Sequence, residues 1–205
     1  MEKATIRPDT RAEIARWIST VIHPMVFPLL TLAVVIEYAT HSLRTTTGWV
    51  LVAILLTSLP VTLLVVTQVM LGRWTDLDVS VRRQRYLLYP FGLAFMIVLA
   101  VVFGRFGAPD IAVRAAVATV IANVADGLIN YFYKVSAHTT GAALCAVFLW
   151  VTSLAWGMPA AIATLAVGWS RVELKRHTPG QVVLGWLVGV TSAYISLHLP
   201  FLAQP

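Results

Sequence analysis

The feature that most limits the possible folds of this chain is a series of long apolar runs separated by short charged segments. A helix needs roughly 20 residues to cross about 30 Å of hydrocarbon, and most of the runs are close to that length. Seven candidate spans follow: Trp17–Ala39, Gly48–Leu71, Leu87–Gly104, Ile111–Tyr133, Thr139–Trp156, Met158–Trp169 and Gln181–Leu199. The sixth run is short, so it is either tilted or half of a broken element with its neighbour, and a count of six stays open.

The composition supports a membrane protein of this kind. The chain is 59% hydrophobic and 12% charged, whereas a soluble domain has about 45–50% apolar and about 25% charged residues. No repeat, low-complexity tract or linker divides it. We therefore predict an all-α, polytopic membrane helix bundle of six to seven transmembrane helices, forming a single domain over residues 17–205.

The N-terminal residues and the single cysteine restrict this picture further. Residues 1–16 are charged and include acids, so they predict an interfacial amphipathic segment and not a cleaved signal peptide. Cys145 lies in an apolar run, which argues against a disulfide framework and against a cysteine metal site.

Three polar clusters lie in the connections between the predicted spans. They are residues 73–85, residues 134–138 and residues 170–181. Two membrane crossings separate each cluster from the next, so all three are expected on the same side of the membrane. A site that all three clusters share requires this arrangement.

The distribution of Lys and Arg favours the cytoplasm for that side. The N-terminus lies on the clusters' side and carries Lys3, Arg7, Arg11 and Arg16, while the opposite side has Arg44, Arg105 and Arg114. We expect a multi-pass protein of the cell's inner membrane with a cytoplasmic site. The net charge of +6 does not indicate nucleic-acid binding, because the basic residues lie in short loops, where topology or anionic headgroups explain them.

Cations that converge at a membrane interface form a site for a multiply charged anion, and phosphate is the natural candidate. The available donors are Arg82, Arg83, Arg85, Lys134 and Arg171, with Ser136 as a neutral one. A neutral imidazole can attack phosphorus, and a second histidine can protonate the leaving oxygen. This chemistry needs no metal or other cofactor, and we predict none.

The third cluster resembles a motif of the type 2 phosphatidic acid phosphatase (PAP2) family, which is related to vanadium haloperoxidases. The family motif is Ser-Arg, five residues, His, three residues, Asp. Ser170, Arg171 and His177 match it, while Gln181 stands where the motif has Asp.

The other two clusters resemble the family's remaining motifs less closely. The second motif, Pro-Ser-Gly-His, keeps its Ser and His as Ser136 and His138. The first motif is Lys, six residues, Arg-Pro. Residues 82–90 give one alignment to it, and the run Arg82-Arg83-Gln84-Arg85 gives a looser one. The resemblance covers residues 73–199 and implies a PAP2-like helix bundle.

The resemblance implies a role for each matched position. His177 would be the nucleophile that forms a phosphohistidine, and His138 the general acid. Gln181 would orient His177 by accepting its imidazole N–H, but an amide cannot stabilise an imidazolium as a carboxylate does, so slow turnover is expected. Glu173 could compensate for the missing Asp. The phosphate would be bound by Arg171, Ser136, Lys134 (in place of the motif Lys) and one or two of Arg82, Arg83 and Arg85.

The leading interpretation is an integral-membrane, metal-independent phosphatase whose partners are a lipid or isoprenoid phosphate or diphosphate and the surrounding membrane lipids. One alternative is a lipid-phosphate binding or transport protein with little turnover, suggested by Gln181. Another is a membrane phospho- or prenyltransferase, because Asp76 and Asp78 are similar to one half of an aspartate-rich diphosphate–Mg²⁺ site.

Several polar residues also have a structural interpretation. We expect His23, His41 and His198 to be interfacial or packing histidines. The run 82–85 could serve only as a headgroup-binding loop, and His138 and His177 could be a pair of interfacial polar residues. Asn123, Asp126 and Asn130 fall on one helical face, where they would hydrogen-bond between helices or line a substrate path.

Overall fold

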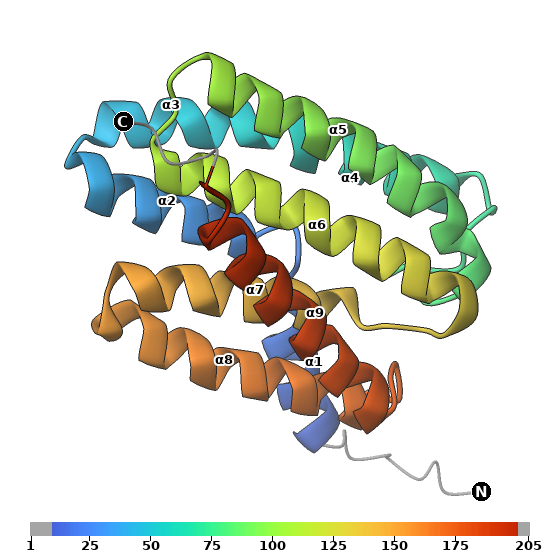
Figure 1. Cartoon of the computed structure of the whole chain (residues 1–205). Helices are drawn as coiled ribbons and strands as arrows, with labels where there is room; N and C mark the ends of the chain where they lie inside the picture. The colour runs from blue at the N-terminus through green and yellow to red at the C-terminus, as the bar shows by residue number, and fades with distance from the viewer. Residues whose placement is uncertain (1–9, 201–205) are drawn as a thin grey trace, which may run out of the picture.

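The computed structural model describes residues 10–200, and every regular element in that range is helical (Figure 1). The helices are α1 (Thr10–Val21), α2 (Phe27–Thr40), α3 (Leu43–Ala53), α4 (Leu59–Met70), α5 (Arg85–Arg105), α6 (Asp110–Phe132), α7 (Ala137–Thr152), α8 (Leu154–Glu173) and α9 (Pro179–Leu197). A π-helical turn, η1 (Ile54–Ser58), joins α3 to α4, and a 3-10 turn, η2 (Arg82–Gln84), precedes α5. The predicted all-α fold is confirmed.

Within residues 10–200, four helical runs are long and apolar enough to cross a membrane, which identifies an integral membrane protein. They are Leu43–Met70, Arg82–Arg105, Asp110–Phe132 and Pro179–Leu197. Helices α2 and α7 are shorter apolar helices, and α8 has 20 residues. A total of six spans would require two of these three helices to cross as well, and a total of seven would require all three.

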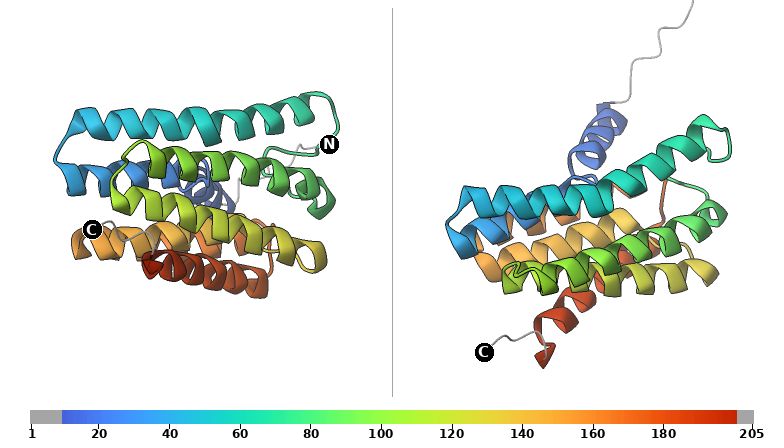
Figure 2. Two further views of the ribbon diagram at one scale, coloured as in Figure 1. Left: turned by 45° about the horizontal axis from the view of Figure 1, so that its top comes forward. Right: turned by 90° about the horizontal axis from the view of Figure 1, so that it is seen from above.

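The first predicted span, Trp17–Ala39, is not one continuous helix, because the chain breaks between α1 and α2. Pro24 has no backbone N–H to donate to a helical hydrogen bond. The N–H of Met25 donates to His23 Nδ1 at 3.2 Å, so this amide bonds to a side chain and not to a helical carbonyl. Helix α1 leaves the other helices at a steep angle (Figure 2, right). Residues 1–9 of the predicted interfacial segment lie outside the described residues.

The sixth predicted span, Met158–Trp169, is too short by several residues at each end. Helix α8 starts after Ser153, whose Oγ accepts the N–H of Ala155 at 3.3 Å, and it continues to Glu173. A Cβ on Gly157 would lie 2.9 Å from Trp150 Cβ, so this glycine allows α8 to fold back tightly against α7. The consequence for the site is that Ser170 and Arg171 belong to the last turn of a helix and not to a loop.

Helix α9 packs against α7 at glycines. A Cβ on Gly185 would lie 2.8 Å from the carbonyl oxygen of Ser136, and one on Gly189 would lie 2.9 Å from Ala143 Cβ. Small residues four apart let two membrane helices approach closely. The contact holds the start of α9 beside the start of α7, where the second and third polar clusters lie.

The α4–α5, α6–α7 and α8–α9 connections all lie at one end of the bundle, on the right in Figure 1. The α2–α3, α5–α6 and α7–α8 connections lie at the other end. The three polar clusters therefore lie at the same end of the bundle, as expected if two helices cross the membrane between each cluster and the next. This brings residues from distant parts of the chain together.

Candidate active site

His177 lies in the short connection between α8 and α9 and is held by the first turn of α9. Thr178 and Gln181 form a capping box, in which Gln181 Oε1 accepts the N–H of Thr178 at 3.2 Å. The same oxygen lies 3.1 Å from His177 Nδ1. Because an amide oxygen can only accept, Nδ1 carries the proton and Nε2 keeps a free lone pair.

The surroundings of His177 keep its ring neutral. The side chain is 6% exposed. Burial lowers its pKa to about 3, and the positive charges of Lys134, Arg85 and Arg171 act in the same direction. At neutral pH the ring is therefore in its nucleophilic form.

Ser136 and His138 lie at the N-terminus of α7, next to His177 in space. Ser136 is the N-cap, and its carbonyl accepts the N–H groups of Thr139 and Thr140 at 3.0 Å. The amides of Ala137 and His138 have no intrahelical acceptor, which makes this helix start suited to an anion. Within the described residues, Ser136 Oγ and His138 Nε2 are buried without a hydrogen-bond partner.

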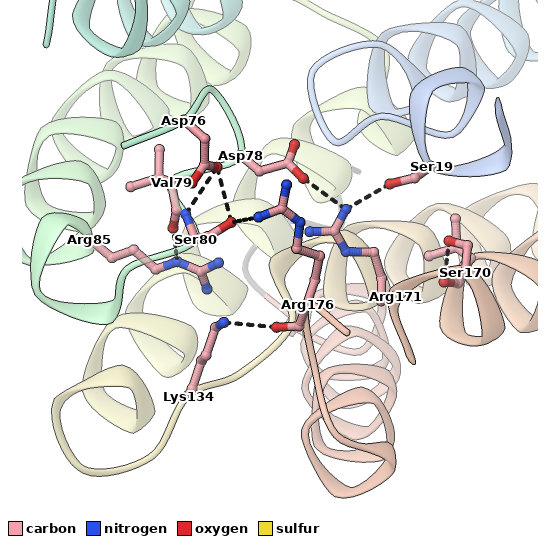
Figure 3. A network of polar contacts seen from close by, with 11 residues as sticks. Ser19, Asp76, Asp78, Val79, Ser80, Arg85, Lys134, Ser170, Arg171 and Arg176 are labelled. Atoms are coloured by element: carbon pink, nitrogen blue, oxygen red, sulfur yellow. Dashed lines mark hydrogen bonds and ion pairs between the residues drawn. The ribbon is translucent and has the colours of Figure 1, made fainter. Parts of the chain in front are cut away.

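Arg171 is buried at the centre of the polar network in Figure 3. Its Nη1 donates to Ser19 Oγ at 2.7 Å and to Asp78 Oδ2 at 3.0 Å. Its Nε is buried and makes no hydrogen bond among the described residues. The guanidinium is thus oriented by α1 and by the α4–α5 connection, and its Nε–H is available for a ligand.

Of the three arginines in the run 82–85, the structure buries Arg85, which is 4% exposed. Arg85 Nε donates to the carbonyl of Val79 at 2.8 Å and Nη1 to that of Val135 at 2.9 Å. Val79 has φ +48°, an uncommon conformation for a β-branched residue, which shows how tightly the loop is folded around this guanidinium.

The other predicted cations lie at the edge of the site or outside it. Arg82 Nη1 donates to the carbonyl of Phe132 at 2.7 Å, and Arg83 is exposed. Lys134 Nζ donates to the carbonyl of Arg176 at 2.8 Å. Burial lowers the pKa of Lys134, and the charges of Arg85 and Arg171 lower it further, so the site holds an excess of positive charge that an anion would relieve.

His23 and Asp78 lie beside His138, although neither was among the residues predicted for the site. Side-chain atoms of His23, Asp78 and His138 that could bind a metal all lie within 4.8 Å of one another. The His23 and His138 rings meet edge to face with centroids 5.4 Å apart. The ring contact agrees with the interpretation of His23 as a packing histidine, and a role for His23 at the site is a proposal. By residue type and distance these three groups could hold a metal ion, a possibility that the sequence did not indicate.

The three polar residues on one face of α6, Asn123, Asp126 and Asn130, have different surroundings. Asp126 Oδ1 accepts the hydroxyl of Thr140 on α7 at 3.1 Å, and Asn130 Nδ2 donates to the carbonyl of Arg82 at 3.3 Å. These two residues bond between neighbouring segments, which was the structural interpretation. Asn123 instead lines a cavity.

An apolar cavity of about 270 Å³ extends from the polar end into the bundle between α2, α4, α5, α6 and α7. His23, Asp78, Arg85 and His138 line its polar end. On α5 the lining residues recur every three or four positions, from Arg85 through Tyr89, Gly92, Met96 and Leu99 to Phe103. At about 1.5 Å per residue the cavity follows this helix for roughly 27 Å, close to the thickness of the hydrocarbon core.

One of three comparisons with known proteins found a match. A comparison with curated proteins and one with solved structures each found no match. The family model described as the PAP2 superfamily matches residues 91–205, which is more than half of the chain and includes His138, Arg171 and His177. The chain therefore belongs to the PAP2 superfamily.

Proposed function

We propose that the protein is a metal-independent lipid phosphatase that hydrolyses a lipid or isoprenoid phosphate or diphosphate through a phosphohistidine on His177. Membership of the PAP2 superfamily supports a phosphatase-type hydrolase in general. The observation that carries the more specific proposal is a neutral His177 and a buried Arg171 together with an unpartnered His138, which lines the polar end of an apolar cavity.

In the first step, Nε2 of His177 attacks phosphorus and the bond from phosphorus to the lipid oxygen breaks. Arg171 Nε, Arg85 and the first amides of α7 would hold the non-bridging oxygens, with Ser136 Oγ and Lys134 as further donors. Gln181 accepts the Nδ1–H of His177 throughout. Because Gln181 is neutral, it stabilises the positive ring that forms less than a carboxylate would.

His138 serves as the proton donor and then as the acceptor. In its protonated form it gives a proton to the departing lipid oxygen. In the second step water attacks the phosphohistidine, the P–N bond breaks, and His138 takes the proton from that water. Inorganic phosphate leaves, and both histidines return to their starting states.

The cavity supports a lipid substrate over a small soluble one. Its walls are mainly apolar, and its polar end includes Arg85 and His138 of the proposed site. A phosphate at the membrane interface could bind there while the tail extends along α5. From the distribution of Lys and Arg, we place the protein in the inner membrane with this end in the cytoplasm.

The second candidate is a lipid-phosphate binding or transport protein, which the neutral Gln181 favours. The transferase interpretation has less support. Asp78 pairs with Arg171, whereas Asp76 accepts the hydroxyl groups of Thr75 and Ser80. The two carboxylates are therefore engaged separately and do not form a ready pair for a diphosphate-bound Mg²⁺.

Phosphate release from detergent-purified protein tests the proposal. The substrates are phosphatidate, phosphatidylglycerophosphate, prenyl phosphate and prenyl diphosphate, each with and without EDTA. We expect EDTA-resistant release from at least one of them, abolished by His177→Ala and by His138→Ala. Saturable binding of these lipids without release would favour the binding or transport protein instead.

A further inference from the structure

We propose that His23 and Asp78 act with His138 as a unit that orients and charge-balances the proton donor of the reaction. This inference rests on the proposed function, because it concerns the group that protonates the leaving oxygen. Both residues precede the segment that the family model matches, residues 91–205. Two of the three members of the unit therefore come from parts of this chain outside the matched segment.

Three separate segments bring the unit together. His23 comes from the α1–α2 break, Asp78 from the α4–α5 connection, and His138 from the first turn of α7. Their reactive side-chain atoms lie within 4.8 Å of one another. At this separation small side-chain movements or one water molecule would complete hydrogen bonds among them.

His23 is held in one tautomer. Its Nδ1 accepts the backbone N–H of Met25 at 3.2 Å, so the neutral ring carries its proton on Nε2. Burial lowers the pKa of His23, although the nearby Asp78 carboxylate opposes this effect. His23 therefore presents an Nε2–H donor to Asp78, and to the ring of His138 only while that ring is neutral.

Asp78 supplies the negative charge that a protonated His138 needs. The charged and titratable groups around this end of α7 are Arg85 on α5, Arg171 on α8, His177 before α9, His23 before α2, Asp78 before α5 and Asp126 on α6. The two arginines oppose a further positive charge. Asp126 is bonded to Thr140. Asp78 gives one oxygen, Oδ2, to Arg171, which leaves Oδ1 for the histidine pair.

This arrangement differs from that of the nucleophile. His177 is oriented by the neutral Gln181, whereas the leaving-group side has a carboxylate. In the reaction, the N–H bond of protonated His138 breaks as the proton moves to the bridging oxygen. The proton that His138 later takes from the attacking water restores the ion pair with Asp78.

A metal ion at the same three residues is the competing explanation, and two contacts oppose it. His23 Nδ1 is already engaged by Met25, and the Arg171 guanidinium, 3.0 Å from Asp78, would repel a cation. The experiment below separates the two explanations.

The test compares leaving groups in the full-length protein. His23→Gln and Asp78→Asn are assayed with a lipid phosphate, whose alkoxide leaves poorly, and with an aryl phosphate such as p-nitrophenyl phosphate, whose phenolate needs little protonation. General acid catalysis contributes about 10²–10⁴-fold. We expect kcat/KM, which reports the phosphorylation of His177 and not the later release step, to fall by about 10-fold or more for the lipid phosphate in each variant, with a much smaller change for the aryl ester in His23→Gln.

Matched controls are His198→Gln at the far end of α9 and Asp76→Asn in the same connection as Asp78. Because Asp78 also orients Arg171, His23→Gln is the deciding variant. Equal losses with both esters, or no loss with either, would overturn the inference while leaving an active wild-type phosphatase intact. Wild-type activity that EDTA removes, and that added Zn²⁺ restores only when His23 and Asp78 are present, would replace it with a metal site. An inactive wild type would overturn both proposals.

Discussion

The Oε1 atom of Gln181 lies 3.1 Å from Nδ1 of His177 and also accepts the backbone N–H of Thr178 at 3.2 Å. One amide therefore caps α9 and orients the proposed nucleophile. The position of this amide suits the proposed role. Because the amide is neutral, it stabilises the imidazolium that would form during phosphoryl transfer less than a carboxylate would.

Gln181→Glu should raise the rate of phosphate release. The substitution keeps the side-chain length and the capping box, and adds the missing charge. Because the pKa of His177 is about 3, it can rise and still leave the ring neutral at pH 7. We expect kcat to increase roughly 10-fold, and Gln181→Met, which has no acceptor, to lower it. A lower kcat in Gln181→Glu would contradict this role for the residue.

The stability of the protein should fall on the acid side. In the unfolded chain the pKa of His177 returns to about 6.5, above its folded value of about 3. Between these values the unfolded state binds more protons, so stability decreases as pH falls through this range. His23, whose pKa is also lowered, contributes in the same direction.

The measurement is Tm in detergent between pH 7 and pH 4. His177→Asn should make the acid-side fall in Tm shallower, whereas His198→Gln should keep the wild-type slope. An unchanged slope in His177→Asn would show that the burial of this histidine is not linked to stability.

The close approach of α7 and α9 predicts a steric effect at Gly185. Gly185→Val would push against the carbonyl of Ser136, 2.8 Å from the position of its Cβ, and would separate the two proposed catalytic histidines. We expect a loss of about 1–3 kcal/mol of stability, seen as a lower Tm, together with reduced activity. Gly48→Ala, whose Cβ would meet nothing within 4 Å, is the control and should keep both. Wild-type Tm in Gly185→Val would disprove the tight contact.

The cavity predicts a dependence on tail length. Gly92→Leu on α5 would place a side chain in the cavity, whereas Val98→Leu would change the exposed side of the same helix. Hydrolysis of long-chain phosphates should weaken in Gly92→Leu, with KM rising several-fold relative to a short-chain ester. If both esters are affected equally, or neither is, the tail does not occupy this cavity.

Local patterns in the sequence predicted much of the bundle and part of the site. Apolar length located most of the helices, and the number of crossings indicated that His138 and Arg171 would lie at the same end. The motif spacing from Arg171 to His177 could be recognised in the sequence, because Arg171 lies in the last turn of α8 and His177 lies shortly before α9. This relation depends only on neighbouring residues.

The rest depended on contacts between distant segments. Arg171 meets Ser19 and Asp78 across 152 and 93 residues, and no local pattern encodes such pairs. Helical phase, and not composition, turned Arg85 inward and Arg83 outward. The one local signal for His23 was Pro24, which indicates a break in the first span and hence a histidine that can turn toward the site.

The central claim is that His177 carries the phosphoryl group, and chemical trapping tests it most directly. His138→Ala is incubated with an aryl phosphate carrying radiolabelled phosphorus, because this ester can phosphorylate His177 without a proton donor while the release step lacks its base. The protein is then denatured in alkali, which preserves phosphohistidine, and digested. We predict label on the peptide that contains His177 and none in the double variant His138→Ala, His177→Ala. A wild-type protein that releases phosphate while no label reaches His177 would contradict the account.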